Sequence, residues 1–157
     1  DLNKQIDIAG EIGQSYIVIP SVPAAERTLS DFEKHAETLN EVGQKCKEAG
    51  LTIVYHNHSF EFEAQGAGTG YEHLLAQTDA NTVYFELDLY WAVNANVSPI
   101  SLFRENPGRF PLVHVKDRSP DGEMADVGKG EFKLLNSPSL SRSRVILYFR
   151  CRKPVEQ

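Results

Sequence analysis

Three segments of this 157-residue chain end in side chains that could bind a divalent metal ion. They read Thr52-Ile53-Val54-Tyr55-His56-Asn57-His58, Val83-Tyr84-Phe85-Glu86-Leu87-Asp88 and Pro111-Leu112-Val113-His114-Val115-Lys116-Asp117. Each begins with apolar or β-branched residues and ends in polar ones, as parallel strands do where a buried sheet or barrel opens onto a site at its carboxyl edge. Imidazole and carboxylate groups arriving together at one edge indicate a divalent metal.

The spacing of these polar side chains supports that reading, because residues two apart on a strand face the same way. The pairs that share a face are His56 with His58, Glu86 with Asp88, and His114 with Lys116. Mixed imidazole and carboxylate ligands in an open site suit Mn²⁺, Mg²⁺, Co²⁺, Fe²⁺ or Zn²⁺. Such an ion would polarise a carbonyl and a neighbouring hydroxyl and so lower the cost of an enediolate. Lys116 could stabilise the anionic oxygen while a carboxylate moves the proton.

Each of these residues also has a structural explanation. A single histidine at a strand end is more often structural than a ligand, and Asp88 alone could cap a following turn. Trp91 could stack on a sugar face or serve only in packing. The glycine-bearing loop at 66–70 lacks the G-x-G-x-x-G spacing of a dinucleotide site. Three candidate ligands at the ends of successive strands nevertheless favour a site.

The elements that must position these residues alternate between strand and helix. Strands begin near residues 16, 52, 83 and 111, a repeat typical of βα units. A helix is expected over Ser30–Ala49, where Ser30 and Glu33 fit a capping box and Gly50 closes the last turn. Another begins at Ser98, with Pro99 in its first turn. Four such units predict a parallel sheet, either a (β/α) barrel or a doubly wound fold. A full barrel needs eight units, so the chain resembles part of one.

Composition narrows the functional classes. Apolar residues make up 41% of the chain, which argues against a disordered protein. The net charge of −6 argues against nucleic-acid binding. Two cysteines cannot form a framework of several disulfides. No transmembrane or signal segment is visible, so no membrane partner is expected. The first residues already read as a helix, so the compartment stays open, with the cytoplasm weakly favoured.

The last 26 residues differ from the rest. Residues 132–157 contain six Lys or Arg and one acidic residue, Glu156. The stretch from Ser137 to Arg144 is rich in serine and arginine and has no helical period. A segment of this kind could bind RNA or act in regulation, but a non-native end is the favoured interpretation. We therefore expect one barrel-type domain over residues 1–131 and an atypical Ser/Arg-rich tail over 132–157.

Four motifs resemble the sugar phosphate isomerase/epimerase family, the xylose isomerase-like TIM barrels. They are Tyr55-His56-Asn57-His58-Ser59-Phe60-Glu61-Phe62, Phe85-Glu86-Leu87-Asp88-Leu89-Tyr90-Trp91, Pro107-Gly108-Arg109-Phe110-Pro111-Leu112-Val113-His114-Val115-Lys116-Asp117 and Val127-Gly128-Lys129-Gly130-Glu131. The resemblance covers about residues 1–131. It implies an α/β fold, a partial (β/α)8 TIM barrel of parallel strands that covers roughly strands 4 to 7 or 8.

The resemblance also implies a set of site residues around a divalent ion, Mn, Mg, Co or Zn. The metal ligands would be His56, Asp88, His114 and Glu156; the catalytic residues Glu156, Lys116 and Glu86; and the substrate-binding residues His58, Trp91 and Glu61. The first ligand is a Glu in many relatives, and His56 holds that place here. In ketose epimerases of this family two metal-bound glutamates exchange the proton, so His56 departs from that scheme.

The implied function is a metal-dependent sugar isomerase or epimerase that abstracts a proton next to a carbonyl and passes through an enediolate. Alternatives are a keto-inositol or keto-sugar dehydratase of the same superfamily, and an inactive fragment or sugar-binding module. The expected partner is a small-molecule sugar. The first three strands of the family barrel are absent, and an open sheet exposes an unpaired edge, so self-association is a further possibility.

Overall fold

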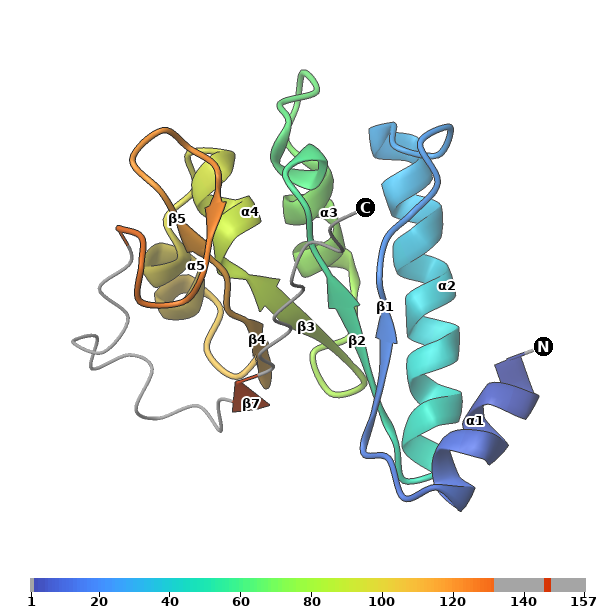
Figure 1. Cartoon of the computed structure of the whole chain (residues 1–157). Helices are drawn as coiled ribbons and strands as arrows, with labels where there is room; N and C mark the ends of the chain where they lie inside the picture. Colours follow the sequence, from blue (N-terminus) through green and yellow to red (C-terminus); the bar gives the residue numbers. More distant parts are fainter. Residues whose placement is uncertain (1, 132–145, 148–157) are drawn as a thin grey trace.

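A curved parallel β-sheet forms the centre of the molecule, with strand order β1-β2-β3-β4-β7 (Figure 1). The computed structural model describes residues 2–131 and the backbone of 146–147. The strands are β1 (Tyr16–Ile19), β2 (Thr52–His56), β3 (Val83–Asp88), β4 (Leu112–His114) and β7 (Ile146–Leu147), and every neighbouring pair is parallel. The predicted α/β fold, part of a TIM barrel with parallel strands, is confirmed.

Side-chain alternation along the strands separates a helix-facing side of the sheet from the side that carries the polar residues. Ile53, Tyr55, Phe85 and Leu87 belong to the main hydrophobic core, and each is fully buried. The residues between them point to the opposite face, because successive side chains of a strand alternate. Chemically active side chains therefore stay off the core without any irregularity in the strands.

Helices connect the strands and cover the core face. They are α1 (Leu2–Glu11), α2 (Leu29–Glu48), the 3₁₀ turn η1 (Phe60–Phe62), α3 (Gly70–Gln77), α4 (Leu89–Asn94) and α5 (Pro99–Glu105). The stripe Phe32, Ala36, Leu39 and Cys46 of α2 is buried in the core, as its 3–4 spacing predicts. Gly50 follows α2 with φ +75°, the left-handed conformation expected there. Within residues 2–131, no helix is both long and apolar enough to cross a bilayer.

The predicted start of α2 was wrong by one to two residues. Thr28, not Ser30, is the N-cap: its hydroxyl accepts from Asp31 N at 3.2 Å, and the Asp31 carboxylate accepts from Thr28 N at 3.2 Å. Both Thr28 and Ser30 have an acidic residue three positions later, so local spacing could not separate the two capping boxes. The cap at Ser98 of α5, with Pro99 in the first turn, is as predicted.

The last predicted strand is shorter than expected. β4 ends at His114, and Asp117 begins a separate hairpin of β5 (Asp117–Arg118) and β6 (Met124–Ala125), which are antiparallel. Asp117 leaves the sheet because its carboxylate accepts hydrogen bonds from Gly128 N and Gly130 N, each at 2.9 Å. These partners lie more than ten residues away, so no local pattern indicated them.

One edge of the sheet, β1, has a single neighbour among the described strands. Val18, on the face away from the helices, is 38% exposed, whereas Val54 of β2 is fully buried. An unpaired edge of this kind can add another strand. Self-association and the domain boundary at residue 131 stay predictions, and the tail other than 146–147 lies outside the described residues.

Candidate metal centre

Strand register brings the candidate ligands together. In the β2–β3 pair His56 lies opposite Glu86, and in the β3–β4 pair Asp88 lies opposite His114. These are the last paired positions of both ladders, so all four residues stand at the carboxyl ends of adjacent parallel strands. The polar cluster is therefore a direct consequence of register and does not depend on loop conformation.

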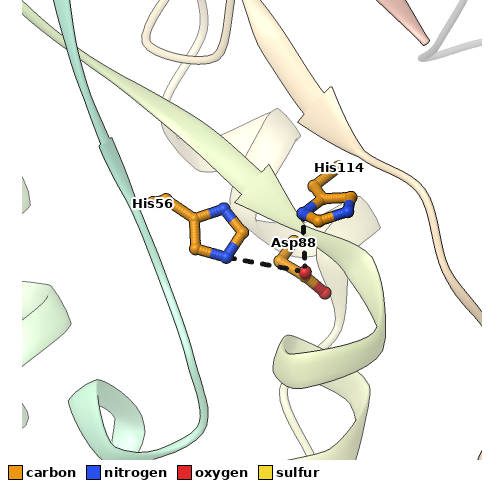
Figure 2. A group of neighbouring side chains, drawn as sticks. All are labelled: His56, Asp88 and His114. Atoms are coloured by element: carbon orange, nitrogen blue, oxygen red, sulfur yellow. Dashed lines mark ion pairs between the residues drawn. The ribbon is translucent and has the colours of Figure 1, made fainter. Parts of the chain in front are cut away.

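His56, Asp88 and His114 form a compact group (Figure 2), with one potential ligand atom from each lying within 4.8 Å of the others. His114 Nδ1 is 3.2 Å from Asp88 Oδ2, and His56 Nε2 is 3.7 Å from the same oxygen. Asp88 is fully buried, His56 is 7% exposed, and His114 is half-buried. Two imidazoles and a carboxylate converging on one point are a donor set that suits Zn²⁺, Mn²⁺ or Co²⁺.

Asp88 is fixed by contacts that leave one carboxylate oxygen for this cluster. Its Oδ1 accepts from Trp91 N at 3.1 Å and thereby caps α4. Its Oδ2 faces both histidines. Asp88 can therefore cap a helix and bind a metal at the same time, because each role uses a different carboxylate oxygen. Helix α4 itself was missed, since it begins directly at the end of β3 without an intervening loop.

Asn57 is a positioning residue that the sequence reasoning overlooked. Its side chain is fully buried, and its Oδ1 accepts from Asp88 N at 2.9 Å while its Nδ2 donates to Asp88 O at 3.3 Å. The amide therefore extends the β2–β3 ladder by one step and holds the backbone of Asp88. The sequence shows only an asparagine directly after a strand, whereas its burial, and with it the need of the amide for hydrogen-bond partners, is seen in the structure.

Glu86 orients His56. The Glu86 Oε2 lies 2.8 Å from His56 Nδ1, and both side chains are about nine-tenths buried. With the Nδ1 proton donated to Glu86, the Nε2 lone pair of His56 is directed at Asp88 and His114. A carboxylate behind a ligand histidine sets the tautomer and raises the basicity of the ligand nitrogen.

The electrostatic surroundings favour neutral imidazoles. Burial lowers the pKa of His114, and the charge of Lys116 acts in the same direction, against the opposing effect of Asp88. Burial likewise lowers the pKa of His58, assisted by His56 and Lys116. A neutral imidazole keeps the lone pair that metal binding requires, so the cluster suits a cation at neutral pH.

Lys116 joins the cluster from the end of β4. Its Nζ donates to Asp88 Oδ2, the oxygen that faces the two histidines. The same ammonium lies 5.6 Å from the ring centroid of Trp91. Lys116 and His114 thus share a face, as the two-residue spacing predicts.

The three predicted substrate-binding residues lie beside the cluster in different settings. His58 packs against His56, with ring centroids 5.1 Å apart, and against Trp91 at 5.5 Å. Glu61 is fully buried, and its oxygens accept from Tyr55 Oη and His58 N, each at 2.8 Å. That arrangement supports a role for Glu61 in holding His58, and substrate contact by any of the three stays a prediction. Glu156, predicted as fourth ligand, lies outside the described residues.

Comparison with known proteins gives the class. No family model matches the chain. A sugar phosphate isomerase/epimerase structure from Parabacteroides distasonis ATCC 8503 is 31% identical, with a TM-score of 0.75 over 99% of this chain and 57% of that one. Inosose dehydratase 2 of Bacillus cereus (strain ZK / E33L) is 28% identical over 127 residues, 74% of this chain and 40% of that protein. The structure of the IOLI protein with a bound zinc atom is 16% identical, with a TM-score of 0.65 over 85% of this chain and 51% of that one, and shows the fold alone.

The fold is thus part of a TIM barrel, similar to that of a sugar phosphate isomerase/epimerase. The predicted resemblance is confirmed: its structural neighbours are sugar phosphate isomerase/epimerase proteins, and its curated relatives are inosose dehydratases of the same superfamily. These relatives are enzymes. The chain spans less than half the length of the curated relative it matches, so any activity of the whole protein belongs to the proposal below.

Proposed function

We propose that this chain carries the metal-binding half of a sugar isomerase or epimerase that abstracts a proton next to a carbonyl. The observation that carries the proposal is the group His56, Asp88 and His114, whose potential ligand atoms lie within 4.8 Å of one another at adjacent strand ends. Active sites of TIM barrels lie at that face. A small-molecule sugar is the proposed substrate, in keeping with the names of the relatives.

The donor set fits a divalent cation. His56 has its second nitrogen engaged by Glu86, Asp88 directs one oxygen inward, and burial favours neutral His114. When bound, a divalent ion would polarise the carbonyl and a neighbouring hydroxyl of the sugar, which lowers the cost of an enediolate. The identity of the ion, Mn, Mg, Co or Zn, is part of the proposal. Glu156 is proposed as the fourth ligand.

The side chains around the metal cluster are proposed to stabilise the enediolate, move the proton and contact the sugar. Lys116 is proposed to stabilise the anionic oxygen of the enediolate, because its ammonium reaches the cluster without belonging to the ligand set. Glu86 and Glu156 are the carboxylates proposed to move the proton. Glu86 is linked to His56 by a 2.8 Å hydrogen bond. His58 and Trp91 offer ring faces for the apolar side of a sugar.

A dehydratase acting on a keto-inositol or keto-sugar is the second candidate. It is favoured by the curated relatives, which are inosose dehydratases. Both reactions begin with proton abstraction next to a carbonyl, but the dehydratase then expels water. Product mass separates them, because epimerisation preserves mass and dehydration removes one water. Sugar binding that is unaffected by a chelator, without turnover, would instead indicate an inactive sugar-binding module.

The testing experiment is calorimetric titration of the full chain with Mn²⁺. We expect one site, lost in His114→Ala and kept in His73→Ala, a matched control whose histidine lies on α3 outside the cluster. A ketose epimerisation screen follows, with detection of dehydrated products. Absence of Mn²⁺ binding by the unaltered chain, or binding that survives His114→Ala, contradicts the proposal for this chain.

A further inference from the structure

A row of ring side chains leads away from the metal cluster and has a cation at each end. Trp91 packs on His58 with centroids 5.5 Å apart, and His58 stacks on Phe60 at 5.8 Å with an interplanar angle of 13°. Lys116 lies over Trp91 at 5.6 Å, and the guanidinium of Arg27 lies over Phe60 at 3.5 Å. All five side chains are half-buried, so each retains part of its surface at the solvent side.

Arg27 reaches this row from a different part of the chain. It stands in the loop between β1 and α2, which follows the carboxyl end of β1 and therefore opens at the same edge of the sheet as the metal cluster. Its Nη2 donates to Val22 O at 3.2 Å, and its own carbonyl accepts from Gln65 Nε2 at 2.7 Å. The bond to Val22 thus holds the guanidinium, and the bond from Gln65 holds the backbone of Arg27.

The charge of Arg27 is not neutralised by the residues that the structure describes. No carboxylate among residues 2–131 lies within ion-pair distance of it, and its neighbour Glu26 lies 3.7 Å from His35 instead. The Nε of Arg27 is buried and has no hydrogen-bond partner in that part of the chain. Burying part of a guanidinium without a counter-charge costs stability, so packing on Phe60 alone is an incomplete explanation of an arginine here.

Arg27 also makes the end of this row that is remote from Asp88 electropositive. His58 lies between the rings of Trp91 and Phe60, and each of those two rings has a cation over it. The resulting surface is apolar in the middle and positive at the end remote from Asp88.

We propose that Arg27 binds an anionic group, a phosphate or a carboxylate, at the end of the sugar remote from the reacting carbonyl. The inference rests on the proposed function and deepens it by naming the substrate class, an acidic sugar whose middle lies along His58 and Trp91. A guanidinium suits this task because its planar donors match both kinds of oxyanion. Lys116 stays with the reacting end through its contact with Asp88.

The test compares three ketoses that differ only at carbon 6: D-fructose, D-fructose 6-phosphate and D-fructuronate. Calorimetry on the full chain with saturating Mn²⁺ measures the affinity for each. We expect at least one acidic ketose to bind about tenfold more tightly than fructose, the size of one charge-assisted contact. Arg27→Gln should remove that preference and leave fructose affinity within about twofold. Lys34→Gln, which removes an exposed cation on α2, should preserve the preference. The preferred ketose distinguishes phosphate from carboxylate.

Equal affinity for all three ketoses, or a preference that survives Arg27→Gln, overturns the inference. Arg27→Lys guards against a folding artefact, because it keeps the charge and should keep part of the preference. Mn²⁺ binding is measured in the same preparations. If the chain binds Mn²⁺ but shows no preference for an acidic ketose, this inference alone is wrong. If the chain prefers an acidic ketose, loses that preference in Arg27→Gln, and does not bind Mn²⁺, only the proposed metal chemistry is wrong.

Discussion

Asp88 and Asp117 are both fully buried, and the hydrogen bonds and ion pairs that fix the two carboxylates can be compared directly. Asp88, at the end of β3, faces the side chains of His56, His114 and Lys116. Asp117, at the start of β5, accepts from the backbone amides of Arg118 at 2.8 Å and of Gly128 and Gly130 at 2.9 Å. The Asp88 carboxylate thus faces side chains, which can rotate, whereas the Asp117 carboxylate accepts hydrogen bonds from backbone amides, which cannot.

The difference indicates which carboxylate is available to a ligand. Side-chain partners can turn away when a cation arrives, and one of the partners of Asp88 is itself a cation that a metal can displace. Backbone amides cannot withdraw without unfolding the 119–131 loop. Burial alone therefore does not mark a functional carboxylate, whereas burial among exchangeable side chains does.

The largest expected effect comes from removing the charge of Asp88. Asp88→Asn keeps the shape and the cap of α4, since asparagine caps helices as well as aspartate. It removes the anionic oxygen shared by the cluster, so we expect Mn²⁺ affinity to fall at least about a hundredfold, more than the loss of a residue that only orients a ligand would cause. Calorimetry measures the affinity, and circular dichroism checks the fold. Unchanged Mn²⁺ binding would remove Asp88 from the site.

The same substitution at Asp117 should produce the opposite pattern. Asp117→Asn places an amide N–H₂ against backbone N–H donors, so at least one charge-assisted hydrogen bond is lost. We expect unfolding free energy in urea to fall by about 2–4 kcal/mol and Mn²⁺ affinity to stay within about twofold. A variant that folds normally but loses the metal would show that the two carboxylates are not distinct in role.

Sequence patterns predicted the strands that carry the site. The runs 52–58 and 83–88 begin with apolar or β-branched residues and end in polar ones, and residues two apart on a strand share a face. The pattern failed where two local solutions competed, as at the Thr28 and Ser30 caps, or where a partner lay far along the chain, as for Asp117 with Gly128. Local rules describe single elements, and distant hydrogen bonds decide where those elements end.

The candidate site was also predicted only in part. His56, Asp88 and His114 could be predicted as neighbours because the ends of successive strands meet at one edge of the sheet. The register between the strands could not be predicted from the sequence, and this register places Asp88 opposite His114 and His56 opposite Glu86. Asn57 and Arg27 were given no role from the sequence, because the amide contacts of Asn57 and the lack of a carboxylate near Arg27 within residues 2–131 are seen only in space.

A smaller effect is expected at Gly130, which bears on the Asp117 side of the comparison. A Cβ there would collide with Arg118 O and with the Asp117 carboxylate. Gly130→Ala should therefore lower unfolding free energy by about 1–3 kcal/mol, with Mn²⁺ affinity preserved. Gly10→Ala is the matched control, because a Cβ at that helical position meets nothing within 4 Å and should be neutral or stabilising. Equal results for the two variants would show that loop 119–131 adapts freely around Asp117.

The smallest effect concerns a third buried carboxylate, Glu61, whose partners are one hydroxyl and one amide. Burial raises its pKa above the usual value of 4.5, so the folded chain binds this proton more tightly than the unfolded chain does. Glu61 therefore adds stability at acid pH, and this contribution is lost as pH rises from 4.5 through the raised value. Glu61→Gln cannot ionise and can still serve Tyr55 and His58, so the variant should lose stability less steeply over that window. Urea unfolding at several pH values measures both slopes, and parallel slopes would show that burial does not raise the pKa of Glu61 in the folded chain.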